Sequence, residues 1–387
     1  MIMEETHSWM NTEILEAILK ASSERTSDKL TVLSTKVTKG VEEGKNNCSA
    51  IYRLHVDVED SNKVTTKSFI VKKVFDFAIG WYRDKENSAF RFVLPQIEQF
   101  VETQLSPRLF LSLDSLLVME DLAEKGFRNV EGSLLNFDHC ALAVEALAKF
   151  HAGSIMIHKS DPRLIEETVG WEVFKDNPNL DVSIFMKSMF SKFQKEISTW
   201  PESDKYAGYF STLVDEVDGY LENLTNRGCR VLNHGDFWLN NMMFRYSQGV
   251  CEVKMVDFQM CRFTSPSYDL QYFVASSADL DVRLHRLDEL YGLYLDTMNR
   301  YLPGVLTEEQ LGRCLHEDAM AYWYGMTSAL CVVLSDPELM YRSDGQDFNS
   351  DVFDRFGLMM KSSGYRELIP RVLDDLARRG LLSTGRG

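Results

Sequence analysis

Hydrophobic and polar positions follow two different spacings in the first third of the chain. Residues 11–22 place apolar side chains three and four positions apart, which predicts a helix. Stretches that alternate in polarity or run β-branched predict strands, and a polar turn separates two of them. The predicted strands cover residues 30–37, 50–58, 65–74, 109–111 and 116–119, and a helix over residues 86–92 is expected to stop before Pro95.

The spacing becomes helical after residue 119. Residues 137–151 carry apolar side chains at mixed three- and four-residue intervals. We therefore expect an α+β fold, in which a small β-rich lobe, residues 1–119, precedes a larger mainly helical lobe, residues 120–387, with a hinge near residues 119–122. Further helices are predicted over residues 182–198, 205–226, 279–300, 307–334 and 365–380, with a short β segment between residues 231 and 258.

Composition narrows the class of protein. The 387 residues are 44% hydrophobic, as in a folded globular protein, and the length suggests two or three domains or lobes. The net charge of −16 argues against a general nucleic-acid binder, because such a protein needs a basic face. The seven cysteines are odd in number and include no C-x-x-C pair, so reduced thiols are expected. Without a secretory leader or a run of about 18 uncharged apolar residues, we expect a cytoplasmic protein with no membrane span.

The candidate chemistry lies in two short segments of the β patch, HGDFWLNN over residues 234–241 and MVDFQ over residues 255–259. Asp236 and Asn241 stand five positions apart, as in the kinase catalytic loop H-R-D-x-x-x-x-N. Phosphoryl transfer to an alcohol needs a carboxylate for the hydroxyl proton, which we assign to Asp236. Asn241 and Asp257 offer the oxygen ligands that magnesium prefers. His-Gly-Asp alone is common turn chemistry, but these residues in this order favour a catalytic site.

A nucleotide side is predicted from the strand over residues 65–74. Alternation places Ile70 and Lys72 on one face, as in the kinase sequence V-A-I-K, where the aliphatic residue covers adenine and the lysine reaches the phosphates. Glu86, on the next predicted helix, is the expected ion-pair partner of Lys72. The alternative is an edge strand that ends in two solvated lysines.

Two further segments are candidates for nucleotide contacts. The loop over residues 40–47 is one residue short of a Walker A motif and lacks its hydroxyl, so a hairpin loop over the phosphates fits better. Its backbone N–H groups and the Ser49 hydroxyl could bind phosphate oxygens. Backbone groups around Glu120 and Leu122 could pair with the adenine edge. A plain turn and a plain interdomain linker are the alternatives.

These segments resemble the ecdysteroid kinase-like family of insects, within the choline-kinase and aminoglycoside-phosphotransferase group of the protein-kinase-like fold. The resemblance covers roughly residues 40–275 and implies a bilobal kinase fold, ATP and Mg²⁺ as cofactors, and transfer of phosphate to a small-molecule hydroxyl. The matching segments are GKNNCS (44–49), FIVK (69–72), ENSAFRFVLP (86–95), LLVMEDL (116–122), GF (126–127), LAKFHAGS (147–154), HGDFWLNN (234–241), MVDFQ (255–259) and PSYDL (266–270).

The resemblance also implies a role for each matching residue. Asp236 is the expected catalytic base, Asn241 and Asp257 the expected magnesium ligands, and Lys72 with Glu86 the expected phosphate-binding pair. Asp269 is expected to be a buried carboxylate that braces the catalytic loop. The sequence departs from the family pattern at Asn47, Cys48 and Phe90, which leaves the phosphate contacts of the loop open.

The acceptor is less constrained by the sequence. A steroid needs a largely apolar pocket, whereas choline needs aromatic faces around its ammonium group. We expect an ATP- and magnesium-dependent kinase for an ecdysteroid or other apolar hydroxylated metabolite. A choline- or ethanolamine-type kinase and a non-catalytic nucleotide- or ligand-binding protein stay open. The aromatic residues of the region are Trp238, Phe263, Tyr268, Tyr272, Phe273, Tyr322, Trp323 and Tyr324; Trp238, Phe263, Tyr272 and Trp323 are the substrate candidates, with core packing as the alternative.

Overall fold

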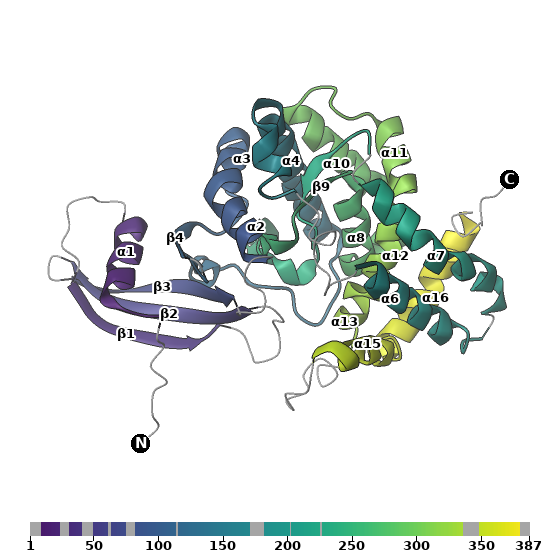
Figure 1. The fold of residues 1–387 in the computed structure, drawn as a ribbon, viewed down its shortest axis with the longest axis horizontal. Coiled ribbons are helices and arrows are strands. Elements are labelled where there is room, and N and C mark those ends of the chain that lie inside the picture. The colour runs from purple at the N-terminus through teal and green to yellow at the C-terminus, as the bar shows by residue number, and fades with distance from the viewer. Residues whose placement is uncertain are drawn as a thin grey trace, which may run out of the picture. The chain divides into compact units, whose positions relative to one another are not determined.

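The computed structural model divides the chain into two compact units, shown in Figure 1. The first unit is Met1–Arg83 with Pro107–Lys125, and the second is Asp84–Ser106 with Gly126–Gly387. These units differ from the single boundary expected near residue 120, and that boundary stays a prediction. The structure describes residues 9–23, 31–40, 49–60, 63–74, 82–113, 115–170, 182–201, 203–224, 227–335 and 348–379.

The first unit is built on an antiparallel sheet of five described strands in the order β1-β2-β3-β5-β4. Helix α1 packs against one face of this sheet, where Ile18 and Leu19 contact a core that includes Phe69 and Val71. Because side chains alternate along a strand, Ile70 and Lys72 point to the opposite face of β3. The elements are α1 (Thr12–Ser22), β1 (Thr31–Lys39), β2 (Ser49–Asp60), β3 (Lys63–Val74), β4 (Leu109–Leu113), β5 (Leu116–Glu120) and the 3₁₀ turn η3 (Leu122–Lys125).

The second unit is mainly helical, with two short antiparallel strand pairs, β6–β9 and β7–β8. The α+β fold class predicted from the sequence is confirmed. The elements are α2 (Tyr82–Ser88), η2 (Ala89–Val93), α3 (Leu94–Val101), α4 (Phe137–Ser160), α5 (Pro162–Glu166), α6 (Val182–Ile197), α7 (Asp204–Asn223), β6 (Val231–Asn233), η5 (Leu239–Asn241), β7 (Met242–Tyr246), β8 (Val250–Met255), η6 (Phe258–Met260), β9 (Arg262–Thr264), α8 (Ser267–Ser277), α9 (Leu280–His285), α10 (Leu287–Tyr301), α11 (Glu308–Glu317), α12 (Ala319–Thr327), α13 (Ala329–Val333), α15 (Phe348–Met359) and α16 (Ser363–Arg378).

The expectation that the helix over residues 86–92 stops before Pro95 is wrong. The chain stays helical through the π-helical turn η2 and continues as α3, which begins at Leu94. Pro95 therefore lies in the first turn of α3, directly after the π-helical turn, where its fixed φ suits the start of an α-helix.

The predicted helix over residues 307–334 is also wrong as one element, because it breaks at Asp318 and Ser328 into α11, α12 and α13. Asp318 is fully buried, accepts a hydrogen bond from the Ser267 hydroxyl, and lies 3.3 Å from the Arg227 guanidinium. These partners are distant in sequence, so helical spacing alone does not predict the break. The predicted helix over residues 279–300 similarly divides at Arg286 into α9 and α10.

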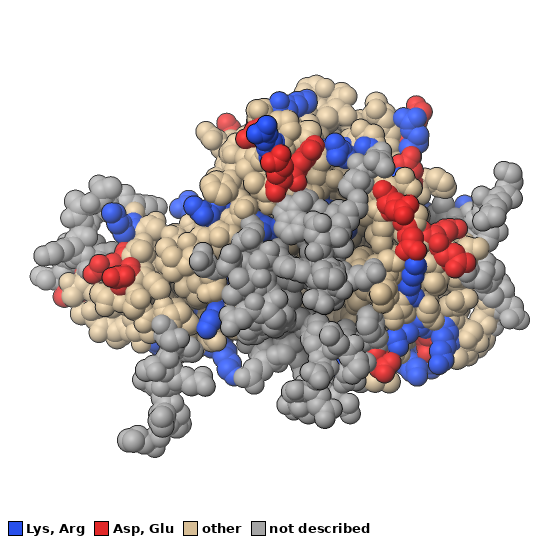
Figure 2. All heavy atoms as spheres, viewed as in Figure 1, with Lys and Arg blue, Asp and Glu red and all other residues tan. Residues whose placement is uncertain are grey.

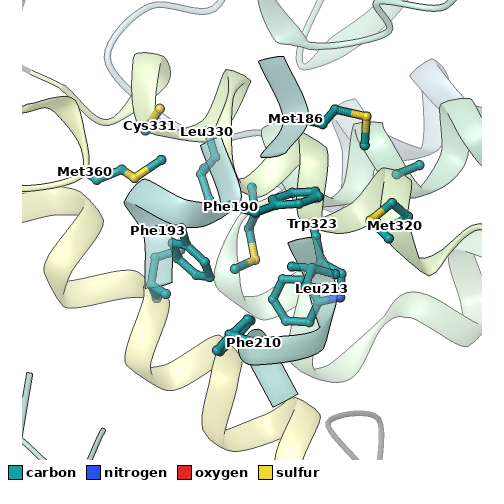
Figure 3. Packing of buried hydrophobic residues seen from close by; sticks show 14 of the residues in the cluster. Met186, Phe190, Phe193, Phe210, Leu213, Met320, Trp323, Leu330, Cys331 and Met360 are labelled. Atoms are coloured by element: carbon teal, nitrogen blue, oxygen red, sulfur yellow. The ribbon is translucent and has the colours of Figure 1, made fainter. Parts of the chain in front are cut away.

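The main core of the second unit is an aromatic and methionine-rich cluster between α6, α7, α12, α13 and α16 (Figure 3). Phe193 and Phe210 meet edge to face at 5.2 Å, and Phe210 meets Trp323 in the same way at 5.2 Å. The Trp323 indole N–H donates to the Tyr209 hydroxyl at 2.7 Å, so its polar atom is satisfied inside the core. This packing holds α12, which lies against α8.

A second set of contacts holds the strand that precedes Asp257. The Met255 N–H of β8 donates to the Leu105 carbonyl at 2.8 Å, and the buried Lys254 ammonium donates to the Gln104 carbonyl. Glu98 of α3 accepts hydrogen bonds from the Leu105 N–H at 2.8 Å and from the Ser106 N–H at 2.9 Å. Burial raises the pKa of Glu98 in spite of these bonds. The segment after α3 is thereby fixed against β8.

Helix α4 runs through the interior of the second unit. It lies against α3, α10 and β6. Within the described residues it is the single helix long and apolar enough to cross a membrane, and 67% of its most apolar 18-residue window is buried in the protein. That burial is the property of a core helix, which needs a hydrophobic surface all round.

Charged side chains of both signs lie side by side on the face drawn in Figure 2. Described ion pairs of the second unit include Lys187 with Asp218 at 2.5 Å and Lys192 with Asp354 at 2.9 Å. These pairs are exposed and are screened by salt, so each contributes at most about 1 kcal/mol to the free energy of unfolding. The acidic excess of the chain is thus interspersed with cations on this face.

The core supports a first prediction. Leu330 is fully buried in the aromatic cluster, whereas Leu358 is 49% exposed. We expect Leu330→Ala to lower the free energy of unfolding by about 2–5 kcal/mol, because it leaves a cavity in a packed core. Leu358→Ala is the matched control and should cost about 1 kcal/mol or less. Urea titration of both variants checks this, and equal losses would contradict the packing described.

Candidate functional site

The candidate catalytic loop follows strand β6 and is held by the carboxylate of Asp269 on α8. Asp269 is fully buried, and its two oxygens accept hydrogen bonds from the His234 N–H at 2.6 Å and the Gly235 N–H at 2.9 Å. Hydrogen bonds from backbone N–H groups stabilise a buried carboxylate. The expectation that Asp269 braces this loop is confirmed.

A buried histidine supports Asp269 from behind. The His151 ring of α4 lies 3.4 Å from Asp269 through Nε2 and 2.7 Å from the Tyr294 hydroxyl through Nδ1. Burial lowers the pKa of His151, so the ring is neutral and carries one proton. A carboxylate only accepts hydrogen bonds, and so Nε2 carries that proton while the Tyr294 hydroxyl donates to Nδ1. His151 lies in the segment LAKFHAGS, but the helical spacing of that segment did not predict its contacts with Asp269 and Tyr294.

Gly235 occupies a position that no other residue can take. Its φ is +82°, and a Cβ atom there would lie 1.8 Å from the Met260 carbonyl oxygen. Both the left-handed backbone and the close approach require glycine. The loop that carries Asp236 therefore touches the turn that follows Asp257.

The carboxylate of Asp236 is held at both oxygens. The Tyr272 hydroxyl donates to Oδ1 at 3.0 Å, and the Asn241 Nδ2 group donates to Oδ2 at 2.9 Å. Desolvation by the surrounding protein, together with the negative charge of Asp257, raises the pKa of Asp236. The residue keeps a partly exposed surface. It is thus a fixed carboxylate that a ligand can reach.

Asp257 sits in an uncommon backbone conformation between β8 and the turn η6. Its φ is 68° and its ψ is 68°, in the left-handed region that few non-glycine residues occupy. The next residue, Phe258, is fully buried, and its ring centroid lies 4.7 Å from that of His234. Strained backbone of this kind persists where the surroundings determine it, which is frequent at functional sites.

Direct hydrogen bonds join the two segments. The His234 Nε2 atom lies 3.0 Å from the Val256 carbonyl, and the Val256 N–H donates to the Asn241 carbonyl at 3.0 Å. Asn241 is therefore attached to the residue that precedes Asp257. The structure brings Asp236, Asn241 and Asp257 together as one constellation, with Tyr272 added to it.

The donor atoms suit a hard cation. The Asn241 amide nitrogen is engaged by Asp236, so its Oδ1 is the atom left to act as a ligand, and Asp257 supplies a carboxylate. Magnesium takes few protein oxygens and completes its shell with phosphates and water. Among the described residues, no group of three or more His, Cys, Asp or Glu side chains could hold a metal without such help.

The nucleotide-binding candidates of the first unit lie on β2, β3 and the end of β5. Lys72 is 4% exposed and pairs in register with Ile51 and Leu117, while Ser49 is buried at the start of β2. Glu86 is 2% exposed on α2 and belongs to the second unit, so its pairing with Lys72 stays a prediction. The predicted phosphate loop after Gly40 lies outside the described residues.

Asp121 fixes the end of β5, a role that the sequence did not predict. Asp121 accepts hydrogen bonds from the Arg53 Nε atom at 2.7 Å and from the Ser68 hydroxyl at 2.7 Å. Its neighbours Glu120 and Leu122 are buried, and Glu120 accepts from the Arg108 N–H at 3.2 Å. Asp121 stands inside the motif LLVMEDL, but Arg53 and Ser68 come from β2 and β3, far from it in the sequence.

The four substrate candidates lie in different surroundings. Tyr272 contacts Asp236, and Trp238 follows the loop with a buried indole N–H that has no hydrogen-bond partner among the described residues. Phe263 packs at 4.5 Å against the His158 ring. Trp323 lies in the aromatic core (Figure 3). The described contacts of Phe263 and Trp323 are those of packing residues, and their substrate role stays a prediction.

Comparisons with known proteins match the chain to one family model and to several solved structures. The model of the ecdysteroid kinase-like family matches residues 43–305, while a search of curated proteins found no match. Structurally, the chain is similar to an ethanolamine kinase of Plasmodium vivax, with 13% identity, a TM-score of 0.43 and coverage of 90% of this chain and 83% of the other.

Two other solved structures are comparable. A choline/ethanolamine kinase family protein from Mesorhizobium loti has 16% identity, a TM-score of 0.38 and coverage of 93% of this chain and 98% of its own. A microcompartment-associated aminopropanol kinase has 13% identity, a TM-score of 0.42 and coverage of 84% of this chain and 94% of its own. At these scores the similarities add no weight to the family match.

The Gly235 geometry gives a second prediction. We expect Gly235→Ala to lower the free energy of unfolding well beyond the roughly 1–2 kcal/mol that left-handed backbone alone costs, because the methyl group displaces the Met260 carbonyl. Gly126 is the matched control, with φ +80° and no atom of the described residues within 4 Å of an added Cβ, so Gly126→Ala should show the backbone cost alone. Thermal unfolding of both variants measures the difference. Indistinguishable midpoints would contradict the close approach.

Proposed function

Because the chain belongs to the ecdysteroid kinase-like family of small-molecule kinases, we propose that it transfers the γ-phosphate of ATP to an alcohol. The observation that supports this most directly is the Asp236 carboxylate, oriented at both oxygens and joined through Asn241 to the segment that ends in Asp257. Phosphoryl transfer depends mainly on positioning and electrostatic stabilisation, and a fixed carboxylate beside hard oxygen donors provides both.

The proposed step begins at Asp236. Each of its oxygens accepts one described hydrogen bond and keeps a second lone pair, so the acceptor hydroxyl can donate to it. The hydroxyl proton passes to this carboxylate as the alcohol oxygen forms a bond to the γ-phosphorus, and the bond from that phosphorus to ADP breaks. The raised pKa of Asp236 makes it a better proton acceptor than an ordinary carboxylate.

Magnesium, when bound, neutralises charge on the phosphates. Asn241 Oδ1 and the Asp257 carboxylate would hold it. The left-handed backbone of Asp257 turns the chain sharply at the end of β8, which favours a ligand at a loop tip over a surface carboxylate.

The remaining assignments complete the proposal. Lys72 binds the α- and β-phosphates with Glu86 as its partner, and Ile70 covers the adenine. Ser49 contacts a phosphate, and the backbone of Glu120 and Leu122 pairs with the adenine edge. The shared face of Ile70 and Lys72 on β3 supports these two assignments. We place the protein in the cytoplasm, where thiols stay reduced; the six cysteines in the described residues are free.

The acceptor we propose is an ecdysteroid or another apolar hydroxylated metabolite. The Tyr272 and Tyr324 rings, 5.6 Å apart beside Asp236, offer an apolar face, but they would also suit the ammonium of choline or ethanolamine. A phosphate-transfer screen with hydroxysteroids, choline and ethanolamine distinguishes these acceptors. ATP binding without transfer to any of them would support a non-catalytic binding protein instead.

The assignment of the base gives a third prediction. Asp236→Ala should lower the phosphoryl-transfer rate by about 10²–10⁴-fold, because the proton acceptor is lost, and should leave ATP binding largely intact. Steady-state kinetics and nucleotide titration measure the two effects. Asp138→Ala, at an exposed position on α4, is the control and should keep the wild-type rate. Full activity in Asp236→Ala would contradict the assignment of Asp236 as the base.

The metal assignment gives a fourth prediction. Asp257→Ala should abolish turnover at millimolar Mg²⁺, because one of the two proposed protein ligands is removed. Asn241→Ala should raise the Mg²⁺ concentration needed for half-maximal rate and also slow the reaction, since Asn241 holds Asp236 as well. Rates over a Mg²⁺ titration check both variants. A normal rate at low Mg²⁺ in Asp257→Ala would be inconsistent with the proposed ligand.

A further inference from the structure

Tyr272 connects the Asp236 carboxylate to a second group of aromatic side chains. Its hydroxyl donates to Asp236 Oδ1 at 3.0 Å, and its ring, 4% exposed, has its centroid 5.6 Å from that of Tyr324 at an interplanar angle of 34°. The hydroxyl thus donates a hydrogen bond to the carboxylate, while the ring packs against the Tyr324 ring of the neighbouring helix α12.

The ring contacts extend outward from Tyr324. Tyr324 of α12 meets Phe185 of α6 at 6.2 Å and 77°, and Phe185 meets Phe356 of α15 at 5.7 Å and 89°. We call Tyr272, Tyr324, Phe185 and Phe356 the aromatic row. Ring contacts of this geometry are attractive. The four rings come from four helices, α8, α12, α6 and α15, and each contacts the next.

Burial distinguishes the three outer members of the aromatic row from the core beside them. Tyr324, Phe185 and Phe356 are partly exposed, whereas core residues such as Phe193 and Trp323 are 0% and 3% exposed. The outer three members of the row therefore keep surface that a ligand can cover. Tyr272 alone is buried, at the end where the row reaches Asp236.

We propose that Tyr272 is a positioning residue for Asp236 and that the aromatic row beyond it is the surface on which the acceptor lies. This inference rests on the proposed kinase function. It requires an acceptor whose hydroxyl reaches Asp236 while an extended apolar skeleton covers Tyr324 and Phe185. A small quaternary ammonium needs rings gathered around one point, and a succession of rings across four helices serves a longer molecule better.

The two ends of the row have separable effects. The Tyr272 hydroxyl and the Asn241 amide together fix the plane of the Asp236 carboxylate, which sets the lone pair that the acceptor hydroxyl meets. Loss of that orientation slows the chemical step and leaves binding unchanged. Loss of an outer ring removes apolar contact made equally before and during reaction, which weakens binding and spares the chemical step.

The test uses full-length protein, ATP and a hydroxysteroid as the probe. Tyr272→Phe should lower kcat about 10- to 100-fold with the KM values for steroid and ATP within about twofold of wild type. Tyr324→Ala and Phe185→Ala should each raise the steroid KM about tenfold or more with kcat within about twofold, because each loses an apolar ring face. Tyr324→Phe keeps the ring and should raise the KM less than Tyr324→Ala.

Phe92 provides the matched control. It is 44% exposed on η2, its described ring contact is with the Arg91 guanidinium, and Phe92→Ala should leave the steroid KM unchanged. Thermal unfolding of each variant shows whether it is folded. If an alanine variant is unfolded, Phe185→Leu and Tyr324→Leu replace it, since both keep an apolar side chain but lose the flat ring.

Calorimetric titration with the hydroxysteroid separates this inference from the proposed kinase function. Steroid binding that Phe185→Ala weakens, with no phosphorylation by wild type, would uphold the acceptor surface and reject the kinase reaction. Steroid phosphorylation with unchanged KM in Phe185→Ala and Tyr324→Ala would overturn the acceptor surface and leave the reaction standing. Phosphorylation of choline alone, or an unchanged kcat in Tyr272→Phe, would overturn the inference as well.

Discussion

The candidate site depends on one buried carboxylate, Asp269. Its two oxygens accept the backbone N–H groups of His234 and Gly235, and this pair of bonds determines where the next residue, Asp236, can lie. A buried anion without partners would cost several kcal/mol, whereas one that accepts hydrogen bonds at both oxygens orders the groups around it. The neutral His151 and the Tyr294 hydroxyl extend the same network into α4 and α10, so the loop is fixed from two sides.

Much of the fold could be predicted because its signals are local. The alternation in β3 correctly placed Ile70 and Lys72 on one face, and turn residues separated the strands. The motif order placed Asp236, Asn241 and Asp257 in one site, because a β hairpin, β7–β8, returns the chain between Asn241 and Asp257. A short hairpin brings its two ends together whatever the rest of the chain does.

Other features could not be predicted because they depend on residues far apart in the chain. The break in the helix at Asp318 is set by Ser267 and Arg227, and the orientation of Asp236 is set by Tyr272 on α8. The aromatic spacing around residue 323 was equally compatible with a pocket and a core. Only packing separates Trp323, inside the core, from its neighbour Tyr324 at the edge.

The contact between Gly235 and the Met260 carbonyl has a consequence for evolution and for engineering. This contact joins the loop of the proposed base to the loop of the proposed metal ligand. Two hydrogen bonds of the Val256 backbone, to the His234 ring and to the Asn241 carbonyl, join the same two loops. Moving one loop relative to the other would break these contacts, so they fix the position of Asp236 relative to Asp257. The outer part of the proposed acceptor surface lies on other elements, α6, α12 and α15, so substitutions there leave these contacts between the two loops in place. Altered chemistry, by contrast, would require both loops to change at once.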